Sequence, residues 1–290
     1  MSEGIILRRE AATAFSTRQV KLVRTADGYD LLPFGDPLTF SEMAAIRSSR
    51  TVSPAFPDSN EISLANVGIS VLLKIQVCDN EYLVLVEQDR GDAGRVLKLV
   101  SGYVETAELD NPFDTVLREI SEEVLFKQGA GYFPFYFDTQ PVGNPYELPQ
   151  QSGVMELHPS GWLAGQQGET VSINGQSVTL PVHLYVHCPT NSVQLVYSLT
   201  VALEAWPEQG FYVEDEKEDG FLVSRLRPER RFILVQCQGE RLQGYFQLID
   251  GKLTRFDGSG YRFSEFFAPR KNRLFVTHQY GGKLNLTAER

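Results

Sequence analysis

Two apolar runs that follow one another closely constrain the fold more than any other feature of the chain. They read GISVLLKIQV and EYLVLVEQ, and the turn-like residues Cys78, Asp79 and Asn80 separate them. Short runs rich in Val, Ile and Leu on either side of a turn predict a β-hairpin. A third strand-like run, RVLKLVSGYVE, follows the glycine-containing loop RGDAG. The sequence therefore predicts a sheet that begins near Val67.

A helix is predicted directly after these strands. Asn111 can act as its N-cap, Pro112 fits the first helical position, and Asp114 complements the positive end of the helix dipole. Apolar residues recur at helical spacing, so one side of the helix is expected to pack on a sheet. These residues are Phe113, Val116, Leu117, Ile120 and Val124. We expect the helix to run on toward Gly129, a natural C-terminal stop.

The first 60 residues look like an extension of this unit. Residues Thr39 to Glu42 have the form of a capping box and predict a short helix through Ala44 and Ile46. The pairs Ser53-Pro54 and Phe56-Pro57 then break the chain, which indicates a linker or domain edge near residues 53–62.

The second half of the chain continues to predict strands. YFPFYFDT, LPVHLYVH and SVQLVYSLTVAL are strand-like, residues 140–167 form a long irregular loop, and Asn174-Gly175 marks a hairpin. RFILVQCQ, RLQGYFQLI and KLTRF predict a three-strand meander with turns at residues 239–240 and 250–251. We expect an N-terminal extension over residues 1–60, a central domain over residues 61–225 and a strand-rich C-terminal region over residues 226–290.

Composition excludes several classes of protein. With 42% hydrophobic and 22% charged residues among 290, disorder is not the expected state. No apolar run approaches the roughly 18 to 20 residues of a membrane span, and MSEGIILRRE is no signal peptide, so a soluble, cytoplasmic protein without membrane contact is predicted. Cys78, Cys188 and Cys237 are far apart, which indicates neither a disulfide framework nor a cysteine zinc site.

The net charge of −10 makes nucleic-acid binding an unexpected function, because that affinity comes mainly from phosphate neutralisation. The charge is uneven, since residues 221–290 carry 13 Lys and Arg against 6 Asp and Glu. This basic tail can face an anionic ligand, a partner protein or the acidic remainder of the chain. A regulator that binds DNA would want a helix-turn-helix, which the strand-like tail does not offer.

The predicted helix carries three glutamates whose spacing raises a question. Glu119, Glu122 and Glu123 stand at i, i+3 and i+4, so their carboxylates crowd one side and repel each other by a few tenths of a kcal/mol per pair. One interpretation is a solvated acidic face of an amphipathic helix. The other is a metal site, because hard divalent cations such as Mg²⁺ take oxygen ligands and turn the repulsion into coordination.

The residues around this helix resemble the box of the Nudix hydrolase family. In this chain the pattern reads Gly102-x5-Glu108-x9-Arg118-Glu119-Ile120-x-Glu122-Glu123-x-Leu125-Phe126. The family's pattern has seven residues, not nine, before the arginine, and a glycine where Leu125 stands. A longer loop before the helix can absorb the extra pair beside Asn111 and Pro112. A rival register with Asp110 in place of Glu108 would put Val104 at the glycine, which disfavours it.

The resemblance implies a fold and a set of roles. The fold would be the Nudix α/β/α sandwich with a mixed sheet, extended at both ends. Glu119, Glu122, Glu123 and the backbone carbonyl of Ser101 would hold Mg²⁺ or Mn²⁺, and Glu119 or Glu122 would orient or deprotonate the attacking water. Gly102 and Arg118 would be structural, with Arg118 paired to Glu108 or Glu105.

The implied reaction is hydrolysis of a pyrophosphate bond in a nucleoside diphosphate linked to another moiety, such as a nucleotide sugar, ADP-ribose or a dinucleotide. Arg90, Arg95 and Lys98 are candidates to contact the pyrophosphate, although each also reads as a solvated surface charge. In many members of the family the general base lies on a later loop. The candidates for it are Glu147, Glu156, Glu214 and Glu216.

Two alternatives accompany this hypothesis. A non-catalytic module of the same fold would bind a nucleotide-like ligand or a partner protein through the basic tail, and Leu125 with the two-residue insertion favours it. His183 and His187 lie about 13 Å apart on a strand, at roughly 3.3 Å per residue, which is too far for one zinc ion. Trp162 and Trp206 are expected to pack. A homodimer is a further possibility, since members of the family often dimerise.

Overall fold

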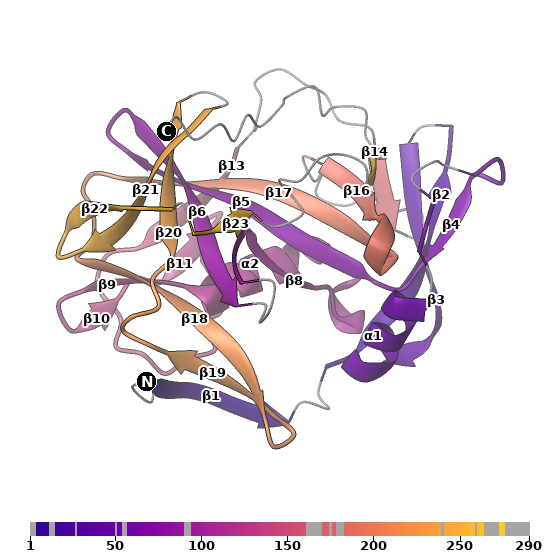
Figure 1. The fold of residues 1–290 in the computed structure, drawn as a ribbon, viewed down its shortest axis with the longest axis horizontal. Helices are drawn as coiled ribbons and strands as arrows, with labels where there is room; N and C mark the ends of the chain where they lie inside the picture. Colours follow the sequence, from indigo (N-terminus) through magenta and orange to yellow (C-terminus); the bar gives the residue numbers. More distant parts are fainter. Residues whose placement is uncertain are drawn as a thin grey trace.

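Strands dominate the molecule and gather into three sheets in the described residues, with two α-helices beside them (Figure 1). The computed structural model describes residues 4–11, 15–26, 28–49, 51–53, 57–89, 94–160, 170–173, 176–177, 183–238, 241–258, 260–263 and 273–275. The fold class is therefore mixed α and β, rich in strands. No helix in these ranges is long and apolar enough to cross a membrane.

The largest sheet is built on two long parallel strands, β5 (Val67–Val77) and β17 (Ser192–Leu203). Almost every side chain of β5 is buried, as expected of a parallel pair covered on both faces. Around them lie β6 (Asn80–Asp89), β7 (Arg95–Lys98), β8 (Val100–Tyr103), β11 (Phe135–Phe137), β12 (Gln140–Pro141), β13 (Met155–Pro159), β16 (His183–His187), β20 (Ile233–Gln238), β21 (Arg241–Ile249), β22 (Lys252–Phe256), β23 (Arg262–Phe263) and β24 (Arg273–Phe275). The order along the main path is β12-β11-β13-β17-β5-β6-β20-β21-β22.

The predicted hairpin is confirmed, because β5 and β6 pair antiparallel with Val77 opposite Asn80. The single third strand predicted for RVLKLVSGYVE is wrong. It is divided at Leu99 into β7, which pairs with β6, and β8, which pairs with β5. The division arises because the two halves of the segment take different partner strands, and it leaves Ser101 and Gly102 on the strand next to the centre of the sheet.

The helix α2 (Pro112–Glu123) begins at the predicted residue, after a 3-10 turn η2 (Thr106–Glu108). The side chain of Asn111 does not cap it, and instead donates from Nδ2 to Asp114 Oδ1 over 2.9 Å. The buried residues of its stripe, among them Val116 and Ile120, belong to the main core together with those of β5 and β17. The predicted apolar face is confirmed.

The predicted continuation of α2 toward Gly129 is wrong. The backbone becomes extended at Val124, and residues Val124–Gln128 form strand β9. Val124 and Phe126 are buried in the main core, whereas Leu125 is buried in a separate cluster with Tyr146 and Phe211. Burial on both faces of an extended segment outweighs the local helical preference, so Leu125 belongs to a strand.

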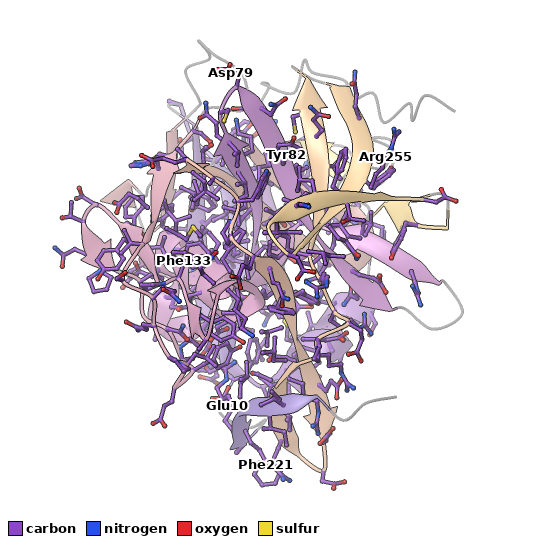
Figure 2. All side chains as sticks on the ribbon, turned by 90° about the vertical axis from the view of Figure 1, so that its left-hand side faces the viewer. Glu10, Asp79, Tyr82, Phe133, Phe221 and Arg255 are labelled. Atoms are coloured by element: carbon purple, nitrogen blue, oxygen red, sulfur yellow. The ribbon has the colours of Figure 1, made fainter. Side chains whose placement is uncertain are left out.

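A second sheet has the order β1-β19-β18-β9-β10. Its strands are β1 (Ile5–Ala11), β9, β10 (Gly131–Tyr132), β18 (Gln209–Glu218) and β19 (Phe221–Leu226). β1 comes from the N-terminus and pairs antiparallel with β19, more than 200 positions later in the chain. Figure 2 shows Glu10 of β1 and Phe221 of β19 at one end of the molecule, and Asp79 of the β5–β6 turn at the other end.

The third sheet joins β15 (Gln176–Ser177), β14 (Thr170–Ile173), β3 (Gly28–Leu38), β2 (Thr17–Arg24) and β4 (Glu61–Leu64), in that order. Helix α1 (Phe40–Ser49) follows β3, and its capping box is confirmed. Thr39 donates to Glu42 Oε2 from both its backbone nitrogen and its hydroxyl, each over 2.8 Å, and the backbone nitrogen of Glu42 donates to Thr39 Oγ1 over 3.4 Å.

Later segments follow the sequence in part. The meander is confirmed as β20, β21 and β22, with its second turn at Asp250 and Gly251, whereas residues 239–240 lie outside the described residues. The Asn174-Gly175 turn also lies outside them, although the flanking strands β14 and β15 pair. The irregular loop expected over residues 140–167 is wrong in part, because it contains β12 and β13.

The division into residues 1–60, 61–225 and 226–290 stays a prediction. Strands of different predicted parts share sheets, since β1 joins β19 and β20 joins β6. YFPFYFDT, predicted as one strand, contributes to both β10 and β11, with Pro134 between them. A proline cannot donate a ladder hydrogen bond, which accounts for this interruption.

Candidate acidic site on helix α2

Strand β8 and helix α2 meet at Gly102, where the side chain of Glu119 fills the space that a Cβ atom would take. A Cβ atom on Gly102 would lie 2.0 Å from Oε1 of Glu119, well inside any real contact distance. Any larger residue here would force the Glu119 carboxylate to move, because this carboxylate packs directly on the backbone of β8. Ser101, the residue before it, lies opposite Ser70 of β5 and receives a hydrogen bond at Oγ from Lys98 Nζ over 3.3 Å.

Arg118 ties the loop that precedes α2 to the helix. Its Nε and Nη2 donate to the two carboxylate oxygens of Glu108 over 2.9 and 3.1 Å. Thr115 Oγ1 adds a hydrogen bond of 2.7 Å to Glu108. Burial opposes ionisation of Glu108, but the bonds from Arg118 and Thr115 outweigh it and lower its pKa. Glu105 lies farther away, at 3.9 Å from Arg118, so Glu108 is the main partner of the arginine, and Asp110 is exposed.

Glu119 and Glu123 are two largely buried carboxylates, and one cation contacts each of them, Arg118 for Glu119 and Lys98 for Glu123. Their side chains are only 12% and 15% exposed. Burial, followed by repulsion from Glu123, raises the pKa of Glu119 from 4.5 to about 8. Burial is also the main cause that raises the pKa of Glu123 to about 7, and Asp215 adds repulsion while Lys98 opposes it. One oxygen of this carboxyl group, Oε2, is buried with no hydrogen-bond partner.

Glu122 has a different environment, since a cation contacts each of its oxygens. Arg8 Nη1 donates to Oε1 over 2.7 Å, and Arg118 Nη1 donates to Oε2 over 3.2 Å. The side chain is only 9% exposed. We call Glu119, Glu122 and Glu123 the acidic cluster. Within it, positive charge is concentrated at Glu122.

The residues present fit a divalent cation at one part of the acidic cluster. One oxygen of Glu123 has no hydrogen-bond partner, and the pKa of both Glu119 and Glu123 is raised, which is the pattern expected where the neighbouring cations do not offset the burial of the carboxylates. Glu122 offers no free oxygen to a metal ion, because an arginine contacts each of its oxygens. Accordingly, no group of three His, Cys, Asp or Glu side chains in the described part of the chain is arranged to hold a metal ion.

Two residues of this site were missed by the sequence reasoning. Arg8 reaches the acidic cluster from β1, and Asp215 from β18 accepts a 2.5 Å hydrogen bond from Ser224 and lies 3.5 Å from Arg8. Asp215 was within reach of a pattern argument, because alternation along a strand puts it on the face opposite to Glu214 and Glu216. No local signal marks Arg8, because its contact with Glu122 spans 114 positions.

The remaining candidates are dispersed. Lys98 lies at the acidic cluster, 3.5 Å from Glu123, but Arg95 is 65% exposed and pairs with Glu87. Arg90 lies outside the described residues. The four candidates for the general base lie elsewhere: Glu147 is exposed, Glu156 accepts from the backbone of Thr139, Glu214 pairs with Arg230, and Glu216 pairs with Arg225 and Arg227.

The aromatic and imidazole side chains do not join the site. Trp206 packs edge-on against Tyr82 with ring centroids 5.2 Å apart, as expected of a packing residue. His187 Nδ1 lies 2.6 Å from Thr190 Oγ1. Trp162 and the side chain of His183 lie outside the described residues.

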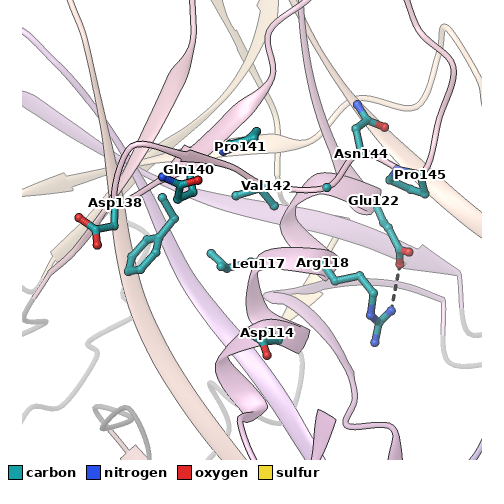
Figure 3. A pocket seen from close by; sticks show the side chains of 12 residues that line it. Asp114, Leu117, Arg118, Glu122, Asp138, Gln140, Pro141, Val142, Asn144 and Pro145 are labelled. Carbon is teal, nitrogen blue, oxygen red and sulfur yellow. Dashed lines mark hydrogen bonds and ion pairs between the residues drawn. The ribbon is translucent and has the colours of Figure 1, made fainter. Parts of the chain in front are cut away.

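A groove of about 670 Å³ lies beside the acidic cluster, between α2 and the segment from Phe137 to Pro145 (Figure 3). Glu122 belongs to the acidic cluster and also lines the groove, as does Arg118, which contacts the cluster. Figure 3 shows the ion pair of Arg118 and Glu122 at one side of the groove. Ser121 Oγ donates to the carbonyl of Gly143 over 2.8 Å, which fixes the far wall to the helix. Volumes of this order accommodate small organic molecules.

Comparisons of the chain with protein-family models, with curated proteins and with solved structures found no match. The comparisons therefore assign no family, and a family assignment depends on the residues from Gly102 to Phe126 and on their geometry.

Proposed function

We propose that the chain is a Nudix-type hydrolase that cleaves a pyrophosphate bond in a nucleoside diphosphate linked to another moiety, with Mg²⁺ or Mn²⁺ as cofactor. The observation that carries the proposal is the pair Glu119 and Glu123, two buried carboxylates with raised pKa values beside a glycine-bearing strand. These residues, with the carbonyl of Ser101, would hold the ion. The Nudix sandwich, a cytoplasmic location and a homodimer belong to the same proposal.

The bound ion would neutralise charge on the phosphates and activate water. Glu119 would orient that water or take a proton from it, as the resemblance implies, and Arg118 at 3.1 Å fixes its carboxylate. Glu122 is less suited, since Arg8 and Arg118 occupy its oxygens. Lys98, already 3.5 Å from Glu123, can contact a phosphate oxygen.

Arg118 would act as a positioning residue. Its two bonds to Glu108 hold the loop, and its contact of 3.1 Å with Glu119 orients that carboxylate. The groove beside α2 would accept the moiety attached to the pyrophosphate, because it shares Arg118 and Glu122 with the acidic cluster. This arrangement leaves the identity of the moiety to the segment from Phe137 to Pro145.

One observation favours the alternative, a non-catalytic module that binds a nucleotide-like ligand or a partner protein. Arginines satisfy Glu122 without any metal, so part of the acidic cluster is neutral in the absence of a cofactor. Such a module would bind a nucleotide without hydrolysing it. Absence of Mn²⁺ binding at millimolar concentrations in calorimetry would favour this function over the hydrolase.

The test of the hydrolase is a screen of compounds with an internal pyrophosphate, incubated with Mg²⁺ or Mn²⁺. Added phosphatase then releases phosphate only from cleaved products. We expect turnover of at least one compound and a loss of at least about 100-fold for Glu123→Gln, a size typical of a removed transition-state contact. The matched control is Glu218→Gln on β18, which should keep full activity. No turnover across the panel, or an active Glu123→Gln protein, would contradict the proposal.

A further inference from the structure

Arg8 enters the acidic cluster from outside the box, on strand β1. The β1–β19 pairing has an irregularity, since Ile6 lies opposite Arg225 and Arg8 lies opposite the adjacent Ser224, which leaves Leu7 as an extra residue. A bulge of this kind re-aims the side chains that follow it. Arg8 is directed inward and is only 18% exposed.

Contacts on several sides fix the guanidinium of Arg8. Nη1 donates to Glu122 Oε1 over 2.7 Å, and Nε donates to Ser224 Oγ over 3.2 Å. Nη2 lies 3.5 Å from Asp215 Oδ2, and the carbon Cζ stands 5.9 Å from the ring centroid of Tyr146. Burial together with this many partners distinguishes Arg8 from a surface ion pair, whose geometry is loose.

The distribution of positive charge over the acidic cluster is uneven. Glu122 receives an arginine at each oxygen, whereas Glu123 has only Lys98 at 3.5 Å on one oxygen and no partner on the other. Mg²⁺ and Mn²⁺ require carboxylate oxygens that are free of other cations. Glu122 Oε1 is therefore closed to an ion for as long as Arg8 donates to it.

We propose that the guanidinium of Arg8 takes the place of a divalent ion at Glu122. The wild-type site then binds one ion, which Glu119 and Glu123 share. Removal of the arginine makes room for a second ion at Glu122. This inference rests on the proposed metal-dependent function. It assigns the N-terminal strand β1 a role in the site, because pairing with β19 holds Arg8 in position.

The test counts bound Mn²⁺ by electron paramagnetic resonance, which reports free aquo Mn²⁺, in titrations of the full-length protein. The wild type should bind one ion per chain, and Arg8→Met should bind two. The matched control is Arg9→Met, because Arg9 lies next along the same strand and stacks on the ring of Phe221 at 4.3 Å, away from the cluster. Arg9→Met should bind one ion. Arg8→Lys, which keeps a cation, should also bind one.

A stoichiometry of one in Arg8→Met, with affinity unchanged, would overturn the role of Arg8 and leave the hydrolase proposal standing. Absence of binding in the wild type and in Arg8→Met would overturn both. Absence in the wild type with binding in Arg8→Met would overturn the proposal of a one-ion site shared by Glu119 and Glu123. Should Arg8→Met fail to fold by circular dichroism, Arg8→Gln gives the same test and should also bind two ions, because it removes the positive charge from Glu122 while keeping a polar side chain at this position.

Discussion

Two regions of the molecule gather glutamates, and they treat them in opposite ways. The acidic cluster on α2 buries Glu119 and Glu123 with few partners, and the pKa of both is raised. On the β18–β19 hairpin, Glu214, Glu216 and Glu218 pair with Arg225, Arg227 and Arg230, an array that we call the β18–β19 ladder.

The difference lies in where the compensating charge comes from. In the β18–β19 ladder, Arg225 contacts Glu216 over 3.0 Å and Glu218 over 2.6 Å, and its hydrogen bonds lower the pKa of Glu218. In the acidic cluster, two arginines contact Glu122, whereas among the described residues Glu119 has only Arg118 and Glu123 has only Lys98. The number of acidic residues along the sequence does not distinguish the acidic cluster from the β18–β19 ladder. The positions of the arginines in the fold do distinguish them. Under-compensated buried carboxylates mark a candidate site, because they call for a cation.

The largest expected difference between the regions comes from removing an arginine from each. Arg118→Met leaves Glu108, Glu119 and Glu122 without their shared partner, so we expect a loss of about 3 to 5 kcal/mol in the free energy of unfolding, the range for a broken buried ion pair. Arg225→Met should shift the urea midpoint far less, since its partners face water. Urea unfolding followed by circular dichroism measures both, and equal losses would contradict the comparison.

The pH dependence of stability gives the next difference. Glu119 and Glu123 have folded-state pKa values raised from 4.5 to about 8 and about 7, so the folded protein holds extra protons between these limits. Their contribution to stability is fully present below about pH 4.5 and is lost as pH rises toward 8. Because each unit by which a pKa is raised costs about 1.4 kcal/mol once the group ionises, we expect the free energy of unfolding of the metal-free protein to fall by several kcal/mol over this window.

The double variant Glu119→Gln/Glu123→Gln removes the titrating groups, so its free energy of unfolding should vary much less between pH 5 and pH 8. Glu218→Gln is the control, because the lowered pKa of Glu218 acts below this window. Urea titrations in the presence of a chelator at each pH measure the slopes. A wild-type stability that rises with pH over the same range would refute the raised pKa values.

A smaller effect is expected from the glycine against which Glu119 packs. Gly102→Ala places a methyl group 2.0 Å from Glu119 Oε1, so the carboxylate must move, at a cost of about 1 to 3 kcal/mol for overpacking. Gly260→Ala is a matched control, since a Cβ there meets no atom within 4 Å. Thermal unfolding and Mn²⁺ titration of both variants check the prediction. Unchanged Mn²⁺ affinity in Gly102→Ala would show that Gly102 does not contribute to the site.

The sequence predicted the parts of the fold that local patterns determine. The β5–β6 hairpin, the β20–β22 meander, the start of α2 and the capping box of α1 each depend on residues within a few positions of one another. The end of α2 was not predictable in this way. Val124 to Phe126 leave the helix because β18, some 85 positions later, pairs with them and because separate hydrophobic clusters cover the two faces of the strand.

The residues of the candidate site likewise fall into a local group, which the sequence predicts, and a distant group, which it does not. Gly102, Glu108, Arg118 and the three glutamates come from one continuous segment, and their spacing predicted that they would meet. Arg8 and Asp215 come from strands that only the sheet pairing brings close to α2, so spacing along the sequence does not show that they meet the acidic cluster. The charges of Arg8 and Asp215 therefore help to determine how many divalent ions the acidic cluster can bind.

The most direct test of the account is anomalous diffraction at the manganese edge from a crystal soaked in Mn²⁺. We predict one peak within about 2.5 Å of carboxylate oxygens of both Glu119 and Glu123, a distance typical of metal–oxygen bonds, with Arg8 still on Glu122. A crystal without a peak at these carboxylates, or with manganese bound at the β18–β19 ladder instead, would contradict the claim that the under-compensated pair is the metal site.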